Sequence, residues 1–330
     1  MWVCNECFAD EEIRKEVENN SIDEGKCDVC GKTGKRCDLS VFVDFFVSVI
    51  QLFKKDANSE DTIISILERD WNIFSNSLCA QTILNEVIHA NALAISIDDK
   101  VSYIDDIINR VIVWDYIKKD VKENSRYFVD YDRVEAYAHI VPSSDLVEGT
   151  LLYRARIIPE GKKKLKRRDM GCPEMGKATA GRANPLGIPY LYLCKDEKTT
   201  YYEVRSVYLD KLSIGKFRIQ RDLKIVDFNS KSSLFLSFDG TNPLSDTVVK
   251  KKILEVLSHD LSKPMRRYDT ELEYIPTQLI CEYCKLNNAD GICFGSSLHS
   301  GGVNYVLFNP EDAKCISVVS REIKSIHIGI

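Results

Sequence analysis

Apolar residues recur at helical spacing between about residues 40 and 130, and this spacing predicts a helical region. The pattern is carried by VFVDFFVSVIQLFKKD, TIISILERDWNIF, CAQTILNEVIHANAL and YIDDIINRVIVWDYIKKDVKE. Glycine is absent from Lys35 through Glu148, which suits a bundle of helices. The most apolar run, residues 39–53, contains Asp44 and is shorter than the roughly 20 residues that span a bilayer. We therefore expect a buried or amphipathic helix there and no membrane segment.

From about residue 145 the pattern changes to short β-rich runs that are separated by glycine and proline. These runs are TLLYRARII, YLYL, GKFRIQ, LKIVDF, VNYVLFN and ISVVSREIKSIHIGI. Two stretches among them, residues 245–261 and 274–287, keep helical spacing. The order predicts an α+β domain over residues 145–330, preceded by a helical domain over residues 39–144 and a small module over residues 1–38.

The composition is that of an ordinary globular protein, with 44% hydrophobic and 29% charged residues among 330. The net charge of −5 argues against a protein that coats nucleic acid through its overall charge. The opening of the chain lacks the basic stretch and apolar core of a secretory signal. Twelve cysteines without such a signal suggest the reducing cytoplasm, where clustered cysteines are more often metal ligands than disulfides.

Two CxxC pairs near the N-terminus have the spacing of a zinc ribbon. Cys4 and Cys7 belong to CNEC, and Cys27 and Cys30 follow about 20 residues later in CDVCGKTGK, which has the glycines that a tight turn needs. Four thiolates fill a tetrahedron and leave no position for water, so we predict a structural zinc ion. Cys37 is close enough in sequence to be an alternative fourth ligand.

Arginines mark two stretches of the second half. In LYRAR, Arg154 and Arg156 alternate on a predicted strand, so both side chains lie on one face of it, and a guanidinium group suits phosphate. In GRANPLGIPYLYL, glycines, an asparagine and two prolines predict a stiff loop that holds Arg182. Tyr190 and Tyr192 alternate on the strand that follows. A solvated strand face and a plain loop are the alternatives.

Two further stretches offer a carboxylate and hydroxyl groups. In TTYYEVR, Thr200 and Glu203 form a T-x-x-E capping box, so Glu203 either caps a helix or stabilises a developing cation. In DGICFGSSLHSGG, Ser296 and Ser297 can bind phosphate through hydroxyl and backbone N–H groups, or they belong to a polar hairpin loop. The chain has no Walker A motif, no GxGxxG and no GxSxG elbow around these serines, which excludes P-loop, Rossmann and α/β-hydrolase chemistry.

The order of these motifs resembles the RES domain, which is named for an arginine, a glutamate and a serine. LYRAR, GRANPLGIPYLYL, YYEVR, YIPTQLICEYC and GICFGSSLHSGGVNYVLF follow one another over residues 145–315. Known members include bacterial toxins that consume NAD by phosphorolysis, and their fold is similar to that of ADP-ribosyltransferases. The resemblance implies an α+β, ADP-ribosyltransferase-like RES domain behind the helical region and the zinc module.

The resemblance also implies roles for individual residues. The family arginine, glutamate and serine correspond to Arg154, Glu203 and Ser296 as catalytic residues. NAD is expected to bind to Arg182 and Tyr192, which correspond to family positions. It is also expected to contact Arg156 and Ser297, which stand beside matched positions. Many members carry an aromatic residue where Ala183 stands, and the family serine is assigned to Ser296 or to its neighbour Ser297.

The resemblance implies a cytoplasmic, NAD-consuming toxin or defence effector. Phosphorolysis of the nicotinamide–ribose bond would give nicotinamide and ADP-ribose 1″-phosphate, with inorganic phosphate as co-substrate. The alternative acceptor is a macromolecule, which would make the chain an ADP-ribosyltransferase. An antitoxin or immunity protein is an expected partner, because toxins of this kind usually need one.

An RNA-binding or RNA-cleaving function is a further alternative. The helical region resembles the HEPN-like domain that precedes RES in some bacterial proteins, and RVEAYAH, from Arg133 to His139, fits the Arg-x4–6-His motif of HEPN ribonucleases. KKKLKRR, residues 162–168, holds six basic residues in seven. We favour the interpretation that RVEAYAH matches by coincidence and that residues 162–168 form a solvated loop. Nucleic acid is therefore not the favoured partner.

Overall fold

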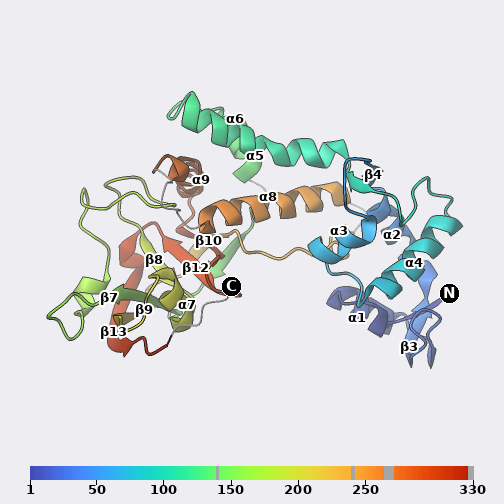
Figure 1. The fold of residues 1–330 in the computed structure, drawn as a ribbon, viewed down its shortest axis with the longest axis horizontal. Coiled ribbons are helices and arrows are strands. Elements are labelled where there is room, and N and C mark those ends of the chain that lie inside the picture. The colour runs from blue at the N-terminus through green and yellow to red at the C-terminus, as the bar shows by residue number, and fades with distance from the viewer. Residues whose placement is uncertain (139–140, 239–241, 264–270, 326–330) are drawn as a thin grey trace. The chain divides into compact units, whose positions relative to one another are not determined.

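The computed structural model describes residues 1–138, 141–238, 242–263 and 271–325 (Figure 1). The chain divides into two compact units, one formed by residues 1–112 and 231–251 and the other by residues 113–230 and 252–330. Helices α5 (Asp105–Glu123) and α8 (Leu244–Ser262) contribute residues to both units. None of the helices in the described ranges is both long and apolar enough to cross a membrane.

The first unit opens with a small antiparallel sheet in the order β1-β3-β2. Its elements are β1 (Trp2–Cys4), the 3₁₀ turn η1 (Asn5–Cys7), α1 (Glu11–Asn19), β2 (Asp23–Lys26) and β3 (Thr33–Asp38). Helix α1 begins where it does because the Asp10 carboxylate accepts the backbone N–H groups of Glu12 and Ile13. The sheet holds CNEC and CDVC close together.

The rest of the first unit is mainly helical, as its apolar spacing predicts. Its elements are η2 (Leu39–Phe42), α2 (Val43–Ile50), β4 (Phe53–Lys55), α3 (Ile63–Asp70), α4 (Ser77–Ala90) and β5 (Val101–Tyr103). Stacked and tilted phenylalanine rings fill its core, among them Phe8, Phe42, Phe45, Phe46 and Phe74. Strands β4 and β5 form a two-stranded ribbon that the helical spacing did not predict.

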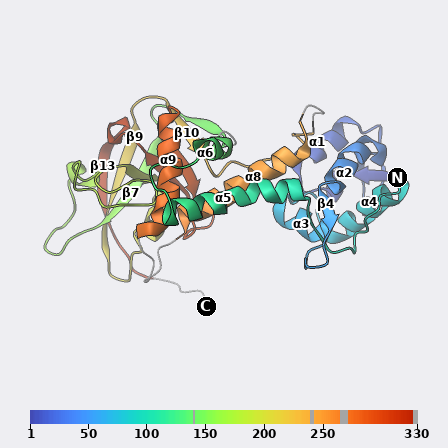
Figure 2. The same cartoon turned by 90° about the horizontal axis from the view of Figure 1, so that it is seen from above.

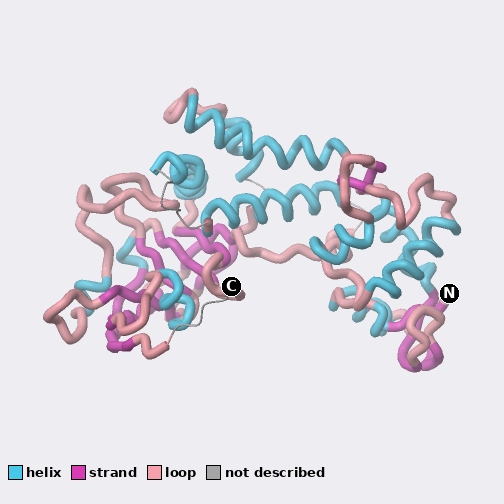
Figure 3. Tube along the Cα trace, in the orientation of Figure 1, coloured by secondary structure: helices cyan, strands magenta, loops and turns pink. Residues whose placement is uncertain are grey.

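The second unit contains a mixed eight-stranded sheet in the order β13-β9-β7-β8-β12-β11-β10-β6. Strands are magenta in Figure 3. Among the described strands of this sheet, only β10 and β11 pair in parallel. The strands are β6 (Ser143–Leu146), β7 (Leu151–Ile157), β8 (Leu191–Cys194), β9 (Lys211–Ile219), β10 (Leu223–Asp227), β11 (Gly291–Gly295), β12 (Val303–Leu307) and β13 (Ala313–Glu322). The mixed sheet with its helices confirms the α+β class, and each β-rich run contains a strand.

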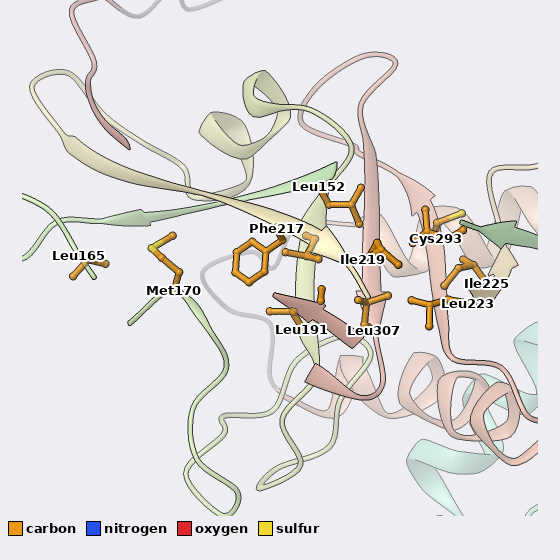
Figure 4. Close-up of a cluster of buried hydrophobic side chains, with 13 residues drawn as sticks. Leu152, Leu165, Met170, Leu191, Phe217, Ile219, Leu223, Ile225, Cys293 and Leu307 are labelled. Carbon is orange, nitrogen blue, oxygen red and sulfur yellow. The ribbon is translucent and has the colours of Figure 1, made fainter. Parts of the chain in front are cut away.

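A cluster of apolar side chains covers one face of this sheet (Figure 4). Leu152 of β7, Leu191 of β8, Phe217 of β9 and Leu307 of β12 are buried in it. Leu165 and Met170, from the loop that holds KKKLKRR, are buried in the same cluster. The loop is therefore anchored to the core through its apolar residues, while its basic side chains are exposed.

The helices of the second unit are α6 (Tyr131–Ala138), α7 (Glu197–Glu203) and α9 (Ile275–Leu286), with 3₁₀ turns η3 (Arg167–Met170), η4 (Glu271–Tyr274) and η5 (Pro310–Asp312). Helix α9 packs against α6 (Figure 2) and β11. Helix α7 packs against β7. In the part of the chain that the structure describes, β7 and β8 pair only at Tyr153 and Cys194. Beyond this pair the sheet opens, and the opening is where the candidate site lies.

Candidate active site

A cavity of about 470 Å³ lies where β7 and β8 stop pairing. Its walls come from both strands, from helix α7, from the last turn of α8 and from the loop that carries Arg182. This volume is within the usual range for small-molecule sites. The charged residues that line it are Glu203 and three arginines, Arg154, Arg182 and Arg205.

Arg154 and Arg156 lie on the same face of β7, as their alternation predicts. Arg154 Nη1 donates to the backbone carbonyls of Met170 (3.3 Å) and Gly171 (3.2 Å), and Arg156 Nη2 donates to the Gly171 carbonyl at 2.5 Å. Arg156 Nε is buried and has no hydrogen-bond partner among the described residues. Arg154 lines the cavity, whereas Arg156 is not among the lining residues, so Arg156 is a neighbour of the site and not part of its wall.

The two guanidinium groups are close together without an acidic partner among the described residues. Burial lowers the pKa of Arg154, and the charge of Arg156 lowers it further. Neutral carbonyls satisfy hydrogen bonds but do not cancel positive charge. An anion bound in the cavity would therefore be stabilised by Arg154.

The loop that carries Arg182 is stiff, because its side chains bond to its own backbone. Asn184 is buried and donates to the carbonyls of Thr179, Pro185 and Ile188, while its Oδ1 accepts the Tyr192 hydroxyl at 2.8 Å. A side chain at Gly181 would place Cβ 2.5 Å from Asn184 Oδ1 and 2.8 Å from the Tyr192 hydroxyl. Only glycine fits this close approach.

Arg182 lines the cavity and caps the end of helix α8. Its Nη1 donates to the carbonyl of Asp260 at 2.8 Å, and its guanidinium lies over the Tyr274 ring, 5.4 Å from the centroid. The last carbonyls of a helix have no partner within the helix, so an arginine is a favourable neighbour for them. Burial lowers the pKa of Arg182.

Glu203 is the last residue of α7, so the capping-box interpretation of Thr200 and Glu203 is wrong. The helix starts at Glu197, and the Asp196 carboxylate caps it by accepting the Thr199 backbone N–H at 2.8 Å. Glu203 Oε1 accepts Ser296 Oγ at 2.7 Å and Asn304 Nδ2 at 2.8 Å. Glu203 Oε2 has no hydrogen-bond partner in the described part of the chain, which leaves it available to a ligand.

The two serines of the GSS loop have different neighbours. Ser296 Oγ donates to Glu203 and accepts the backbone N–H groups of Leu298 and His299, each at 3.2 Å. Ser297 Oγ donates to the Ser262 carbonyl at the end of α8, at 2.6 Å. Neither serine is among the lining residues of the cavity. Ser296 therefore acts on the site through Glu203, and Ser297 joins its loop to α8.

His299 belongs to the site region, although sequence reasoning did not select it. Its Nδ1 lies 2.9 Å from Thr199 Oγ1, which donates to the Asp196 carboxylate at 2.7 Å. Its ring stacks on Tyr202 at a centroid distance of 4.8 Å. These contacts join the serine loop to the start of α7. The sequence signal was the SLHSGG stretch, but a histidine in a loop does not reveal its partner.

The four cysteines of the two CxxC pairs converge in the first unit. Their sulfur atoms all lie within 4.8 Å of one another, and the shortest separation is 3.4 Å, between Cys4 and Cys30. A zinc ion with Zn–S distances of about 2.3 Å would place its ligands about 3.8 Å apart, so the donor set fits tetrahedral zinc. Cys37 is buried on β3 outside this group and is not the fourth ligand.

The residues behind the RNA hypothesis do not form a site in the described ranges. Arg133 on α6 pairs with Asp130 at 2.9 Å, and His139 lies outside the described residues. The basic side chains of residues 162–168 are exposed on the anchored loop. An exposed loop of this kind can attract anions but shows no aromatic side chain for stacking on bases.

Comparisons with known proteins point to the second unit. The sequence profile of the RES domain matches residues 151–325. A search of the curated proteins finds no significant match. Among solved structures, the crystal structure of the M. tuberculosis MbcT–MbcA toxin–antitoxin complex aligns over 58% of this chain and 90% of that chain, with 15% sequence identity and a TM-score of 0.32.

Proposed function

The chain belongs to the RES domain family, and on this premise we propose that it cleaves the bond between nicotinamide and ribose in NAD. One observation carries the proposal. The carboxylate of Glu203, held by Ser296 and Asn304, shares a cavity with three arginines that have no acidic partner among the described residues. Such a cavity suits an anionic ligand that develops positive charge on a sugar carbon.

We propose that Arg154 and Arg182 bind the pyrophosphate. Each guanidinium already donates to backbone carbonyls, and these bonds fix its position before the ligand arrives. Charge-assisted hydrogen bonds to phosphate oxygens would offset the positive charge that burial disfavours at both residues. Tyr192, whose hydroxyl is bonded to Asn184, would present its ring to the nicotinamide or ribose.

Glu203 would stabilise the transition state. Nicotinamide leaves as a neutral molecule, so the reaction needs little acid catalysis and depends on positioning and charge stabilisation. The free Oε2 of Glu203 would bind a ribose hydroxyl and face the oxocarbenium-like carbon. Ser296 and Asn304 hold the other oxygen and would fix the carboxylate in this orientation.

We propose inorganic phosphate as the acceptor, which would give ADP-ribose 1″-phosphate. The test is to incubate the purified chain with NAD, with and without phosphate, and to follow nicotinamide by chromatography. It tests both the cleavage of NAD and the identity of the acceptor. Phosphate-dependent release is the expected result. Intact NAD under every condition would refute the enzymatic proposal. With NAD that is labelled in its adenosine part, label recovered on protein or nucleic acid would identify a macromolecular acceptor.

We further propose that the chain is a bacterial toxin or defence effector, with an antitoxin or immunity protein as partner, and that zinc stabilises its N-terminal module. The toxin proposal follows from NAD consumption, because a cell without NAD stops growing. Expression of the wild type should lower cellular NAD and arrest growth, whereas Glu203→Gln should do neither. Growth arrest by both forms at normal NAD would contradict it.

A further inference from the structure

Arg205 is the third arginine of the cavity, and the sequence gives it no role although it ends the YYEVR stretch. It lies two residues after Glu203, is exposed, and lines the cavity together with Arg154 and Arg182. No carboxylate in the described ranges pairs with it. Arg221, another exposed arginine of the same unit, does have such partners, since it pairs with Asp290 and Asp312 at 2.6 and 2.9 Å.

The backbone of Arg205 is in a conformation that glycine usually adopts. Its φ is +50°, in the left-handed region, directly after Val204 at the C-terminal end of α7. Its N–H donates to the Tyr202 carbonyl at 2.9 Å and so completes the end of the helix. Glycine is the favoured residue here, so the arginine side chain is present despite a conformational cost.

Arg205 is an exposed residue of the cavity wall, whereas Arg154 and Arg182 are half-buried in it. Arg182 and Arg205 line the same cavity; burial lowers the pKa of Arg182, and the charge of Arg205 lowers it further. Arg154 and Arg182 supply one positive charge for each negative charge of a pyrophosphate. Arg205 supplies a third, which NAD alone does not use.

We propose that Arg205 binds the acceptor phosphate. This inference rests on the proposed function, because phosphorolysis brings a second anion to the ribose carbon beside Glu203. The Glu203 carboxylate repels that anion, and a cation two residues away offsets the repulsion. A phosphate oxygen then forms a bond to the ribose carbon, the bond to nicotinamide breaks with its electron pair going to the ring nitrogen, and neutral nicotinamide leaves.

Arg205→Asn removes the positive charge but keeps the backbone conformation, because asparagine tolerates the left-handed region. With NAD saturating, we expect the KM for phosphate to rise by at least about tenfold, the effect of losing a charge-assisted hydrogen bond. The KM for NAD should stay unchanged, and Arg205→Lys should restore most of the phosphate affinity. Arg218→Gln, at an exposed arginine of β9 outside the cavity wall, is the matched control.

An unchanged KM for phosphate in Arg205→Asn, or a rise in the KM for NAD alone, overturns the inference while the proposed function stands. Nicotinamide release by the wild type that does not depend on phosphate overturns this inference and the proposed phosphate acceptor, while the proposed cleavage of NAD stands. A second measurement does not need turnover: inorganic phosphate should raise the Tm of the wild type and of Glu203→Gln but not of Arg205→Asn. An equal rise in all three also overturns the inference.

Discussion

The cysteine cluster and the arginine-lined cavity arrange their polar groups in opposite ways. In the cluster, four sulfur atoms lie within 4.8 Å of one another and three of the four cysteines are buried. In the cavity, three arginines and one glutamate line about 470 Å³, and no carboxylate of the described residues pairs with the arginines. The cluster is complete once a metal ion is added, whereas the cavity keeps unmatched charge at its wall.

This difference separates two roles. Ligands that converge on one point stabilise the fold, because binding energy of the metal becomes folding energy. Charges that remain unmatched lower stability and raise affinity for an external ion. Changes to the cluster should therefore alter stability, and changes to the cavity should alter turnover.

Removal of the proposed zinc ion should have the largest effect on stability. Structural zinc contributes on the order of 10 kcal/mol to the folding of small modules. A chelator should therefore strongly lower the temperature at which the first unit unfolds. Thermal unfolding with and without chelator, together with metal analysis, measures this. Cys7→Ser should lose the metal, whereas Cys37→Ser, at a buried cysteine of the same sheet, should retain it. Equal metal loss in both variants would contradict the assignment of Cys37.

Glu203→Gln should have the largest effect on turnover. Replacing the carboxylate by an amide removes the charge that stabilises the sugar cation, and nicotinamide release should fall by at least about 100-fold. The Tm should change little, because Glu203 is exposed and does not cap the helix. Glu197→Gln, at the other end of α7, is the matched control and should retain most activity. A lower Tm with full activity would restore a structural role for Glu203.

The sequence predicts local features of both regions and few of the contacts between distant segments. The spacing of Cys4, Cys7, Cys27 and Cys30 predicts the cluster, because two short turns supply all of its ligands. The Arg182 loop was predicted to be stiff from its own residues, and the bonds of Asn184 confirm it. These features are determined within a few residues of chain.

Other features depend on partners far away in the sequence. Asn304 holds Glu203 across 101 positions, and the carbonyl of Asp260 holds Arg182 across 78. Asn304 lies within GICFGSSLHSGGVNYVLF, but nothing in that stretch identifies it as the partner of Glu203, and Asp260 belongs to none of the motifs. The prediction that Thr200 and Glu203 form a capping box is wrong because Asp196, a stronger N-cap than Thr200, stands four residues earlier and starts the helix there.

The two serines give a smaller test of the same contrast. Ser296 bonds to Glu203, whereas Ser297 bonds to the carbonyl of Ser262. Loss of a hydrogen bond to a charged group should lower kcat about tenfold in Ser296→Ala, with the KM for NAD unchanged. Ser296→Thr keeps the hydroxyl and should recover activity. Ser297→Ala should act mainly on stability. A larger loss of kcat in Ser297→Ala would reverse the assignment.

Asp196 should show the smallest effect, and it tests whether a carboxylate near the cavity can be purely structural. Burial raises its pKa, but the Thr199 hydroxyl and backbone N–H bonds lower it by more, so the net shift is downward. A lowered pKa means that the charged form stabilises the fold above the unfolded value of about 3.9 and that this stabilisation is lost as pH falls through the folded pKa.

Asp196→Ala should therefore lower the free energy of unfolding by about 1 kcal/mol at neutral pH, the usual effect of losing an N-cap. The difference from the wild type should shrink below about pH 4, where the wild-type carboxylate becomes protonated. Denaturant unfolding across this pH range measures it. Asp196→Asn keeps a capping side chain without the charge, so it should stay near wild-type stability and lose the pH dependence. If turnover fell as far in Asp196→Ala as in Glu203→Gln, the carboxylates at both ends of α7 would serve the reaction. Asp196 would then not be a purely structural residue.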